Sequence, residues 1–157
     1  MSENAARVAQ ALEAKIGSDA VAGDWMEVSQ ERINAFADAT LDHQFIHVDE
    51  EKAAATPFGG TIAHGFLTLS LLVHLSTSIE DEMPDMTGLL MGVNYGANKI
   101  RFINPVPSGA KIRATGSTMS VELKGNAVDH TRLMTVEIEG QEKPALVAEW
   151  ISRLVFG

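Results

Sequence analysis

Two short stretches of the sequence carry residue types that can move a proton next to a carbonyl group. The first holds Asp42 and His47, five positions apart. In a loop the two side chains can converge on one water, and the carboxylate can orient the imidazole and tune its pKa. This makes them a candidate general acid/base pair. From the spacing alone a simpler explanation is favoured, in which Asp42 caps a turn and His47 binds a backbone group.

The same stretch offers ligands for a metal ion. His43 and His47, together with Asp42 and Asp49, have the side chains that zinc or iron binds. Two histidines four positions apart share one face only on a helix, whereas residues 45–48 read as extended. We therefore expect no metal site here.

The second stretch is Gly59-Gly60-Thr61-Ile62-Ala63-His64-Gly65, which opens a long apolar segment. The first amides of a helix have no partner within the helix and lie at the positive end of its dipole. They would stabilise a carbonyl oxygen that becomes negative in a transition state. Gly65 is costly inside a helix, which is understandable if a ligand must approach its N–H closely. Close packing of the helix on a sheet explains this glycine equally well.

Charge is spread unevenly along the chain, which has 157 residues, a net charge of −9 and no cysteine. The acidic balance argues against nucleic acid as a partner, and the missing cysteines exclude disulfides and Cys-ligated metal centres. Residues 86–121 nevertheless contain no acid and four bases, Lys99, Arg101, Lys111 and Arg113. Solvated strand faces explain these bases, and an anionic ligand is the sharper alternative.

The second half of the chain predicts a β-sheet. Alternating segments rich in β-formers cover residues 89–103, 111–121, 128–138 and 146–156. Because short turns join them, we predict that the four strands form an antiparallel meander in sequence order.

The first half predicts helices, and the fold class is therefore α+β. Helices are expected over residues 3–16, from Ser29 to about 39, and over 50–55 after an Asp49 cap, with 42–47 as an ordered loop. A longer helix, about 62–76 with Thr61 as its cap, is apolar nearly all round. Such a helix is buried on most sides, so we expect a curved sheet wrapped around it.

No segment reads as a membrane span or a secretory signal. The charge-free stretch 53–79 is interrupted by Pro57 and the glycines that follow, and its apolar part is too short to cross a bilayer. The N-terminus lacks a basic region followed by an apolar run. We expect one domain over 1–157, with a helical extension over about 1–20, located in the cytoplasm.

Residues 39–49, ATLDHQFIHVD, followed by Ala53 and by IAHG at 62–65, resemble the signature of the MaoC-like (R)-specific enoyl-CoA hydratases, which have the hotdog fold. Residues 94–102, NYGANKIRF, resemble the nodulation-protein-N-like branch of that family. The family pattern has Gly, Asn and Pro where this chain has Leu41, Gln44 and Phe45.

The resemblance implies a role for each matching residue. It implies that Asp42 and His47 are the catalytic pair and that the amide of Gly65 binds the thioester oxygen. We assign Gln44 and His64 to substrate positioning. The resemblance also implies a homodimer, with each central helix wrapped by its own sheet and an acyl tunnel near the interface.

The expected reaction is reversible hydration of a trans-2-enoyl-CoA to a (3R)-hydroxyacyl-CoA. Its reverse is the dehydration of a 3-hydroxyacyl-CoA. No metal or redox cofactor is expected, because the thioester already makes C3 electrophilic. The four bases would then contact the phosphates of coenzyme A.

Two alternatives stay open, a hotdog acyl-CoA thioesterase and a non-catalytic acyl-CoA binding subunit. Many hotdog thioesterases place a carboxylate on the central helix, and residues 61–76 contain none. Six apolar residues are candidates for the tunnel wall: Phe45, Phe58, Leu67, Leu71, Leu72 and Met91.

Overall fold

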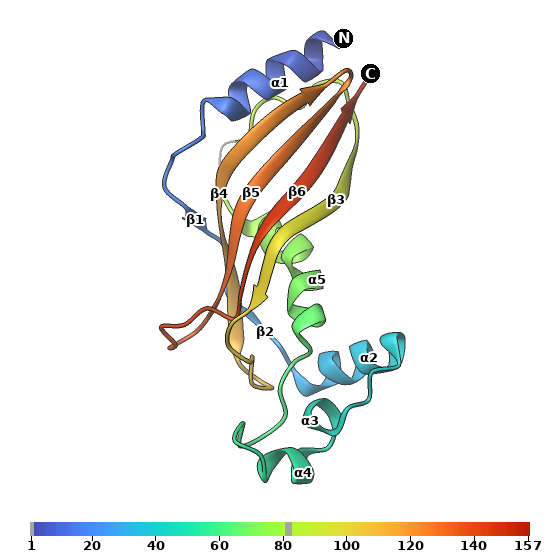
Figure 1. Cartoon of the computed structure of the whole chain (residues 1–157), viewed down its shortest axis with the longest axis vertical. Helices are drawn as coiled ribbons and strands as arrows, with labels where there is room; N and C mark the ends of the chain where they lie inside the picture. The colour runs from blue at the N-terminus through green and yellow to red at the C-terminus, as the bar shows by residue number, and fades with distance from the viewer. Residues whose placement is uncertain (1, 81–82) are drawn as a thin grey trace.

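A single antiparallel sheet carries the fold in the computed structural model, which describes residues 2–80 and 83–157 (Figure 1). Its strand order is β1-β4-β5-β6-β3, and β2 also pairs with β4. The strands are β1 (Val21–Ala22), β2 (Met26–Glu27), β3 (Leu89–Phe102), β4 (Lys111–Lys124), β5 (Ala127–Ile138) and β6 (Leu146–Phe156).

The curved sheet wraps around helix α5 (Gly65–Leu75), as the α+β prediction required. The buried side of α5 meets alternating residues of the long strands, because successive strand residues point to opposite faces. This core contains Leu67, Leu72, Leu75, Ile112, Ala114, Met134, Val136 and Ala148. Burial of these side chains is the main source of stability for the arrangement.

Helix α1 (Glu3–Glu13) covers the far end of the sheet. Its amphipathic sequence buries Val8 and Leu12 in a second apolar cluster with Val128 and Phe156. The Ser2 hydroxyl also donates to the carbonyl oxygen of Gly157 at 2.9 Å, so the two ends of the chain meet there.

The strand order corrects the predicted meander. Strands β4, β5 and β6 are consecutive neighbours, but β3 pairs with β6 at the opposite edge. The connection 103–110 therefore crosses the sheet instead of forming a hairpin. Its Pro105 and Pro107 lack the N–H groups that a hairpin ladder uses. The connection instead bonds to the segment before α5: Ala63 N donates to the Val106 carbonyl oxygen at 2.8 Å.

The central helix begins later than predicted. Ile62 forms an isolated bridge with Pro107, so the segment leading into α5 is extended and His64 occupies the N-cap position. Thr61 does not cap the helix, because its hydroxyl donates to the Gln30 side chain. The helix also keeps one open face, on which Phe66 is 67% exposed.

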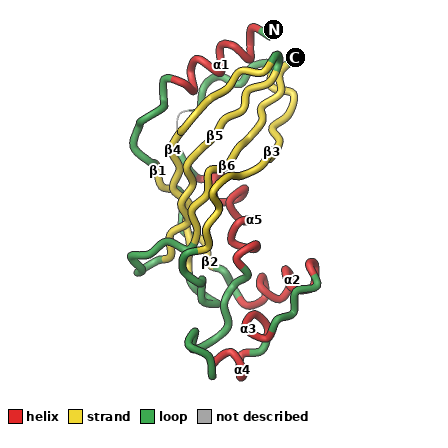
Figure 2. Tube along the Cα trace, in the orientation of Figure 1, coloured by secondary structure: helices red, strands yellow, loops and turns green. Residues whose placement is uncertain are grey.

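Three short helices gather beyond one end of the sheet (Figure 2). They are α2 (Gln30–Thr40), α3 (Phe45–Val48) and α4 (Glu50–Ala54). The predicted caps are confirmed, since Ser29 accepts from Arg32 N and Asp49 from Lys52 N. Residues 45–48 form one helical turn, so reading them as extended was wrong. A 3₁₀ turn, η1 (Ser76–Ser78), follows α5. Within the described residues, no helix is long and apolar enough to span a membrane.

Candidate active site

Asp42 follows directly on the end of α2. The helix stops at Leu41, whose backbone is left-handed with φ 62° and ψ 21°. This conformation is uncommon outside glycine and turns the chain sharply. The Asp42 carboxylate then accepts a long hydrogen bond, 3.4 Å, from Gln44 N. The turn leaves Asp42 exposed, with its carboxylate near the start of α5.

His47 lies in α3 and is 7% exposed. Its Nδ1 lies 2.7 Å from the carbonyl oxygen of Ile62, so Nδ1 donates and the neutral ring keeps its lone pair on Nε2. Gln30 Nε2 donates to the His47 carbonyl oxygen at 2.7 Å and fixes the backbone of this turn.

The surroundings of His47 keep its ring neutral. Burial lowers the pKa of His47 below its ordinary value of 6.5, because an imidazolium loses hydration there. The bond to Ile62 and the charge of Asp42 oppose this shift, while His64 adds to it. The net result is a histidine that is unprotonated near neutral pH and able to act as a base.

His64 joins these two residues. Its ring stacks on the His47 ring with centroids 3.8 Å apart and planes inclined at 25°. Its Nε2 lies 2.9 Å from the carbonyl oxygen of Asp42. One side-chain atom from each of Asp42, His47 and His64 lies within 4.8 Å of the others. The structure thus brings together three residues singled out in the sequence.

This cluster is a poor cage for a metal ion, although it offers one carboxylate and two imidazoles. Stacked rings direct their in-plane lone pairs alongside each other, whereas metal ligands must converge on one point. The other two residues of this stretch with metal-binding side chains, His43 and Asp49, have partners elsewhere. His43 Nε2 lies 2.8 Å from Asp38, and Asp49 is 2.8 Å from Lys52.

Gly65 opens α5 beside the cluster. The first hydrogen bond of the helix runs from Thr68 N to the His64 carbonyl oxygen, so the amides before Thr68 precede the helical ladder. A cavity of about 250 Å³ adjoins this helix end, lined in part by His47, Gly65, Thr68 and Phe102. A Cβ on Gly65 would lie 2.8 Å from the Phe102 ring. Close packing on β3 therefore does require a glycine here, as the packing explanation anticipated.

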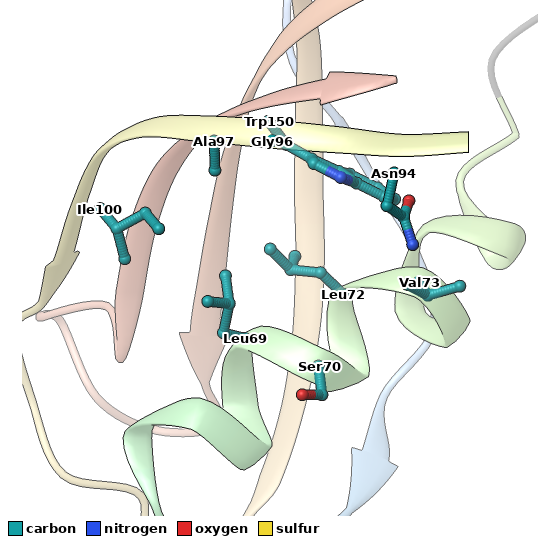
Figure 3. Close-up of a pocket in the computed structure, with 9 residues that line it drawn as sticks. All are labelled: Leu69, Ser70, Leu72, Val73, Asn94, Gly96, Ala97, Ile100 and Trp150. Carbon is teal, nitrogen blue, oxygen red and sulfur yellow. The ribbon is translucent and has the colours of Figure 1, made fainter. Parts of the chain in front are cut away.

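A second cavity, of about 290 Å³, lies between α5 and the sheet (Figure 3). Leu69, Leu72 and Val73 reach it from α5, while Ile100 of β3 and Trp150 of β6 face them. Two of the predicted tunnel residues line cavities: Leu72 this one and Phe58 the first.

The four predicted CoA-binding bases do not form one cluster. Lys99 and Arg101 lie on β3, while Lys111 and Arg113 lie on β4, with β5 and β6 between them. Lys99 pairs with Glu149 at 2.7 Å, and Arg113 pairs with Glu137 at 2.6 Å. Arg101 directly precedes Phe102, which lines the first cavity.

Several residues of the site carry no signal in the sequence. Gln30 supports both His47 and Thr61, but a glutamine on an exposed-looking helix carries no signal of this role. Phe102 and Trp150 line the two cavities, and only the strand order found here brings them to α5. Gln44 occupies the N-cap position of α3 with no cap bond from its side chain, and its role stays a prediction.

The chain is similar to known proteins in both sequence and fold. The family model described as "MaoC like domain" matches residues 11–140. The chain is 51% identical over 154 residues to 3-hydroxyacyl-thioester dehydratase Z of Mycobacterium tuberculosis, covering 98% of this chain and 97% of that protein. It is 45% identical over 144 residues to nodulation protein N of Rhizobium leguminosarum bv. viciae, covering 90% and 88%. The solved (R)-hydratase from A. caviae involved in PHA biosynthesis superimposes with a TM-score of 0.65 at 22% identity, covering 87% of this chain and 97% of that one.

The chain therefore belongs to the MaoC-like domain family, a class of hydratases and dehydratases, and has the hotdog fold. Its likeness to nodulation protein N agrees with the branch that residues 94–102 indicated.

Proposed function

We propose that the protein catalyses reversible hydration of a trans-2-enoyl-CoA to a (3R)-hydroxyacyl-CoA. One observation carries this proposal: the Asp42 carboxylate and a ring nitrogen of His47 lie within 4.8 Å of each other at the end of α5 that begins with Gly65. The names of the relative, a 3-hydroxyacyl-thioester dehydratase, and of the structural neighbour, an (R)-hydratase, support the reaction class and the (3R) outcome.

In the hydration direction one water lies between Asp42 and His47. Nε2 of the neutral His47 ring accepts a proton from this water while its oxygen bonds to C3 of the substrate. The electrons of the C2=C3 bond move onto the thioester oxygen. C2 of this enolate then takes a proton from the same side by way of the Asp42–His47 pair, which gives up the proton it received from the water, and this regenerates both the thioester and the starting state of the pair. Dehydration follows the same steps in reverse.

The amide of Gly65 stabilises the enolate oxygen. It lies at the positive end of α5, ahead of the helix's first hydrogen bond. Removal of one such donor typically costs about 10²–10³ in rate. Every step uses protein groups and water, so the proposed reaction needs no metal and no redox cofactor.

The acyl chain occupies the apolar cavity between α5 and the sheet. The catalytic cavity holds Gly65, Thr68 and Phe102, and Leu69 and Ile100 belong to the next cavity along the same two elements. A chain that leaves the Gly65 amide along α5 passes from the first cavity to the second. For the phosphates of coenzyme A we propose Arg101, because it is an exposed base at the end of β3 that borders the catalytic cavity, whereas Lys99 and Arg113 are paired with carboxylates.

We also propose that residues 1–157 act as one domain and that two copies form a homodimer. The β3 strand pairs only with β6 in the described sheet, so its other edge is open. It exposes Leu90, Met91 and Tyr95 by 65%, 55% and 55%. Open apolar edges of this kind favour association. Light scattering should give twice the 16.9 kDa of one chain.

The test is to incubate the protein with crotonyl-, octenoyl- and dodecenoyl-CoA, and to analyse the configuration of the product. We expect (3R)-hydroxyacyl-CoA with no release of free coenzyme A. Release of free thiol would indicate a thioesterase instead. Binding without turnover would indicate a silent acyl-CoA binding subunit.

A further inference from the structure

His64 makes contacts that a residue packed only for stability does not need. It sits just before α5 and is 3% exposed. One ring nitrogen, Nε2, reaches the backbone carbonyl of Asp42, and one ring face lies against His47. We propose that His64 is a positioning residue that holds both members of the acid/base pair in register. The contacts are independent of the reaction, whereas the predicted effect on rate rests on the proposed function.

The bond to Asp42 is the first part of this role. Asp42 is exposed and follows a left-handed Leu41, and its carboxylate accepts only a long hydrogen bond from Gln44 N within the described part of the chain. The 2.9 Å bond from His64 Nε2–H to the Asp42 carbonyl oxygen anchors the turn from the buried side. Loss of this anchor would leave the carboxylate less well placed toward the shared water.

The ring stack is the second part. The His64 ring contacts Phe36 of α2, with centroids 5.0 Å apart, and stacks on His47, with centroids 3.8 Å apart. His47 is fixed at its Nδ1 edge by Ile62, and the stack fixes the plane of its ring. The two contacts together leave the Nε2 of His47 one direction in which to point.

An unpartnered atom shows that these contacts constrain His64. With the proton on Nε2, the neutral ring keeps its lone pair on Nδ1, and this buried Nδ1 has no hydrogen-bond partner among the residues that the structure describes. Buried polar atoms without partners are rare and costly. The fold tolerates one here because the proton is needed on the side that faces Asp42.

His64 also acts on the titration of His47. Of the titratable groups around His47, Asp42 raises its pKa, and His64 lowers it only when His64 is itself protonated. The α2 residues against the cluster, Gln30 and Phe36, are uncharged. The His64 ring covers one face of the buried His47 ring, so its loss should weaken the burial that lowers the pKa of His47 and let that pKa rise.

Two substitutions separate the two contacts. His64→Phe keeps a ring for the stack and removes the N–H donor. His64→Gln keeps a donor near the position of Nε2 and removes the ring. His74→Gln is the matched control, because His74 is an exposed histidine on the last turn of α5. Each variant is assayed for kcat and KM on crotonyl-CoA, and the pKa of His47 is measured by NMR.

We expect His64→Phe to lower kcat by about 10- to 100-fold with little change in KM, since misplaced catalytic groups cost that much. His64→Gln should recover much of this kcat and move the pKa of His47 up toward 6.5. His74→Gln should match the wild type in both measurements. A wild-type kcat in His64→Phe, or an unchanged His47 pKa in His64→Gln, would overturn the proposal.

The readouts also separate this proposal from the proposed function. If the wild type does not hydrate enoyl-CoAs, the proposed function fails, and the NMR titration still decides the claim about His64. If His64→Phe does not fold, His64→Gln alone decides, through the pKa of His47.

Discussion

The Nδ1–H of His47 is bonded to the carbonyl oxygen of Ile62 at 2.7 Å. Ile62 precedes Gly65 by three residues in the extended segment that leads into α5. A single stretch of backbone thus sets the orientation of the proposed base and delivers the proposed oxyanion amide. Any movement of this stretch changes both, which explains why it is tied to the crossing connection at Pro107.

The first prediction concerns pH. His47 must be neutral to accept a proton from water, and burial lowers its pKa below 6.5. The kcat/KM for hydration should therefore hold as the pH falls from 7 to 6.5, and decline only at lower pH. The measurement is a pH–rate profile on crotonyl-CoA. An acid limb centred above 6.5 would show that a different group, or a protonated His47, controls the reaction.

The second prediction concerns Gly65. In Gly65→Ala the new Cβ would lie 2.8 Å from the Phe102 ring, so that ring must shift. Overpacking of this kind typically lowers the free energy of unfolding by about 1–3 kcal/mol. Urea denaturation measures it, and adding Phe102→Leu should restore most of the loss. A Gly65→Ala protein as stable as the wild type would contradict the close packing described here.

The double variant also separates packing from catalysis at Gly65. If Gly65→Ala with Phe102→Leu regains stability but not hydration, the methyl group obstructs the approach of the thioester to the amide. If both return together, packing on Phe102 accounts for the whole requirement for glycine.

The third prediction concerns acyl chain length. Trp150 lines the cavity between α5 and the sheet, so Trp150→Leu enlarges the space for the acyl chain. The ratio of kcat/KM for dodecenoyl-CoA to that for crotonyl-CoA should rise by about 10-fold. This is the size of discrimination that additional methylenes in an apolar pocket provide. Trp25→Leu is the control, because Trp25 contacts Arg113 of β4 and does not belong to the lining of this cavity. It should leave the ratio unchanged. An unchanged ratio in Trp150→Leu would place the chain elsewhere.

The fourth prediction concerns coenzyme A. Arg101→Glu should raise KM for crotonyl-CoA by about 10-fold at low salt, since the attraction between residue 101 and a nearby phosphate becomes a repulsion. The effect should shrink as salt rises, because screening weakens exposed charges. Lys143→Glu makes the same change of charge at another exposed position and should leave KM near that of the wild type. Equal KM values for the two variants would exclude Arg101 as a phosphate contact.

Local sequence signals predicted most of the elements. Apolar periodicity located the long strands within a few residues, and Ser29 and Asp49 cap helices as their side chains suggested. These signals work because capping and alternation depend on neighbours in the chain. The spacing of Asp42 and His47 permitted convergence but favoured separate local roles for the two residues. The left-handed turn at Leu41, which the sequence alone did not show, brings them together.

The sequence did not predict which strands pair when they lie far apart in the chain. The partner of β3 depends on a connection that crosses the sheet, and nothing local distinguishes a crossing from a hairpin except the two prolines. The contact of Gly65 with Phe102 follows from that pairing, and so does the cavity that Trp150 and the β3 residues line together. The start of α5 was misplaced for the same reason, since Ile62 is held extended by Pro107.

The central claim is that Asp42 and His47 perform the proton transfers of hydration. It is tested most directly by the initial rate of crotonyl-CoA hydration in Asp42→Asn and His47→Ala, each with circular dichroism to confirm the fold. The account predicts that each substitution lowers the rate by about 10³-fold or more, as loss of a general acid or base does. A folded variant of either kind with near-wild-type activity would contradict it.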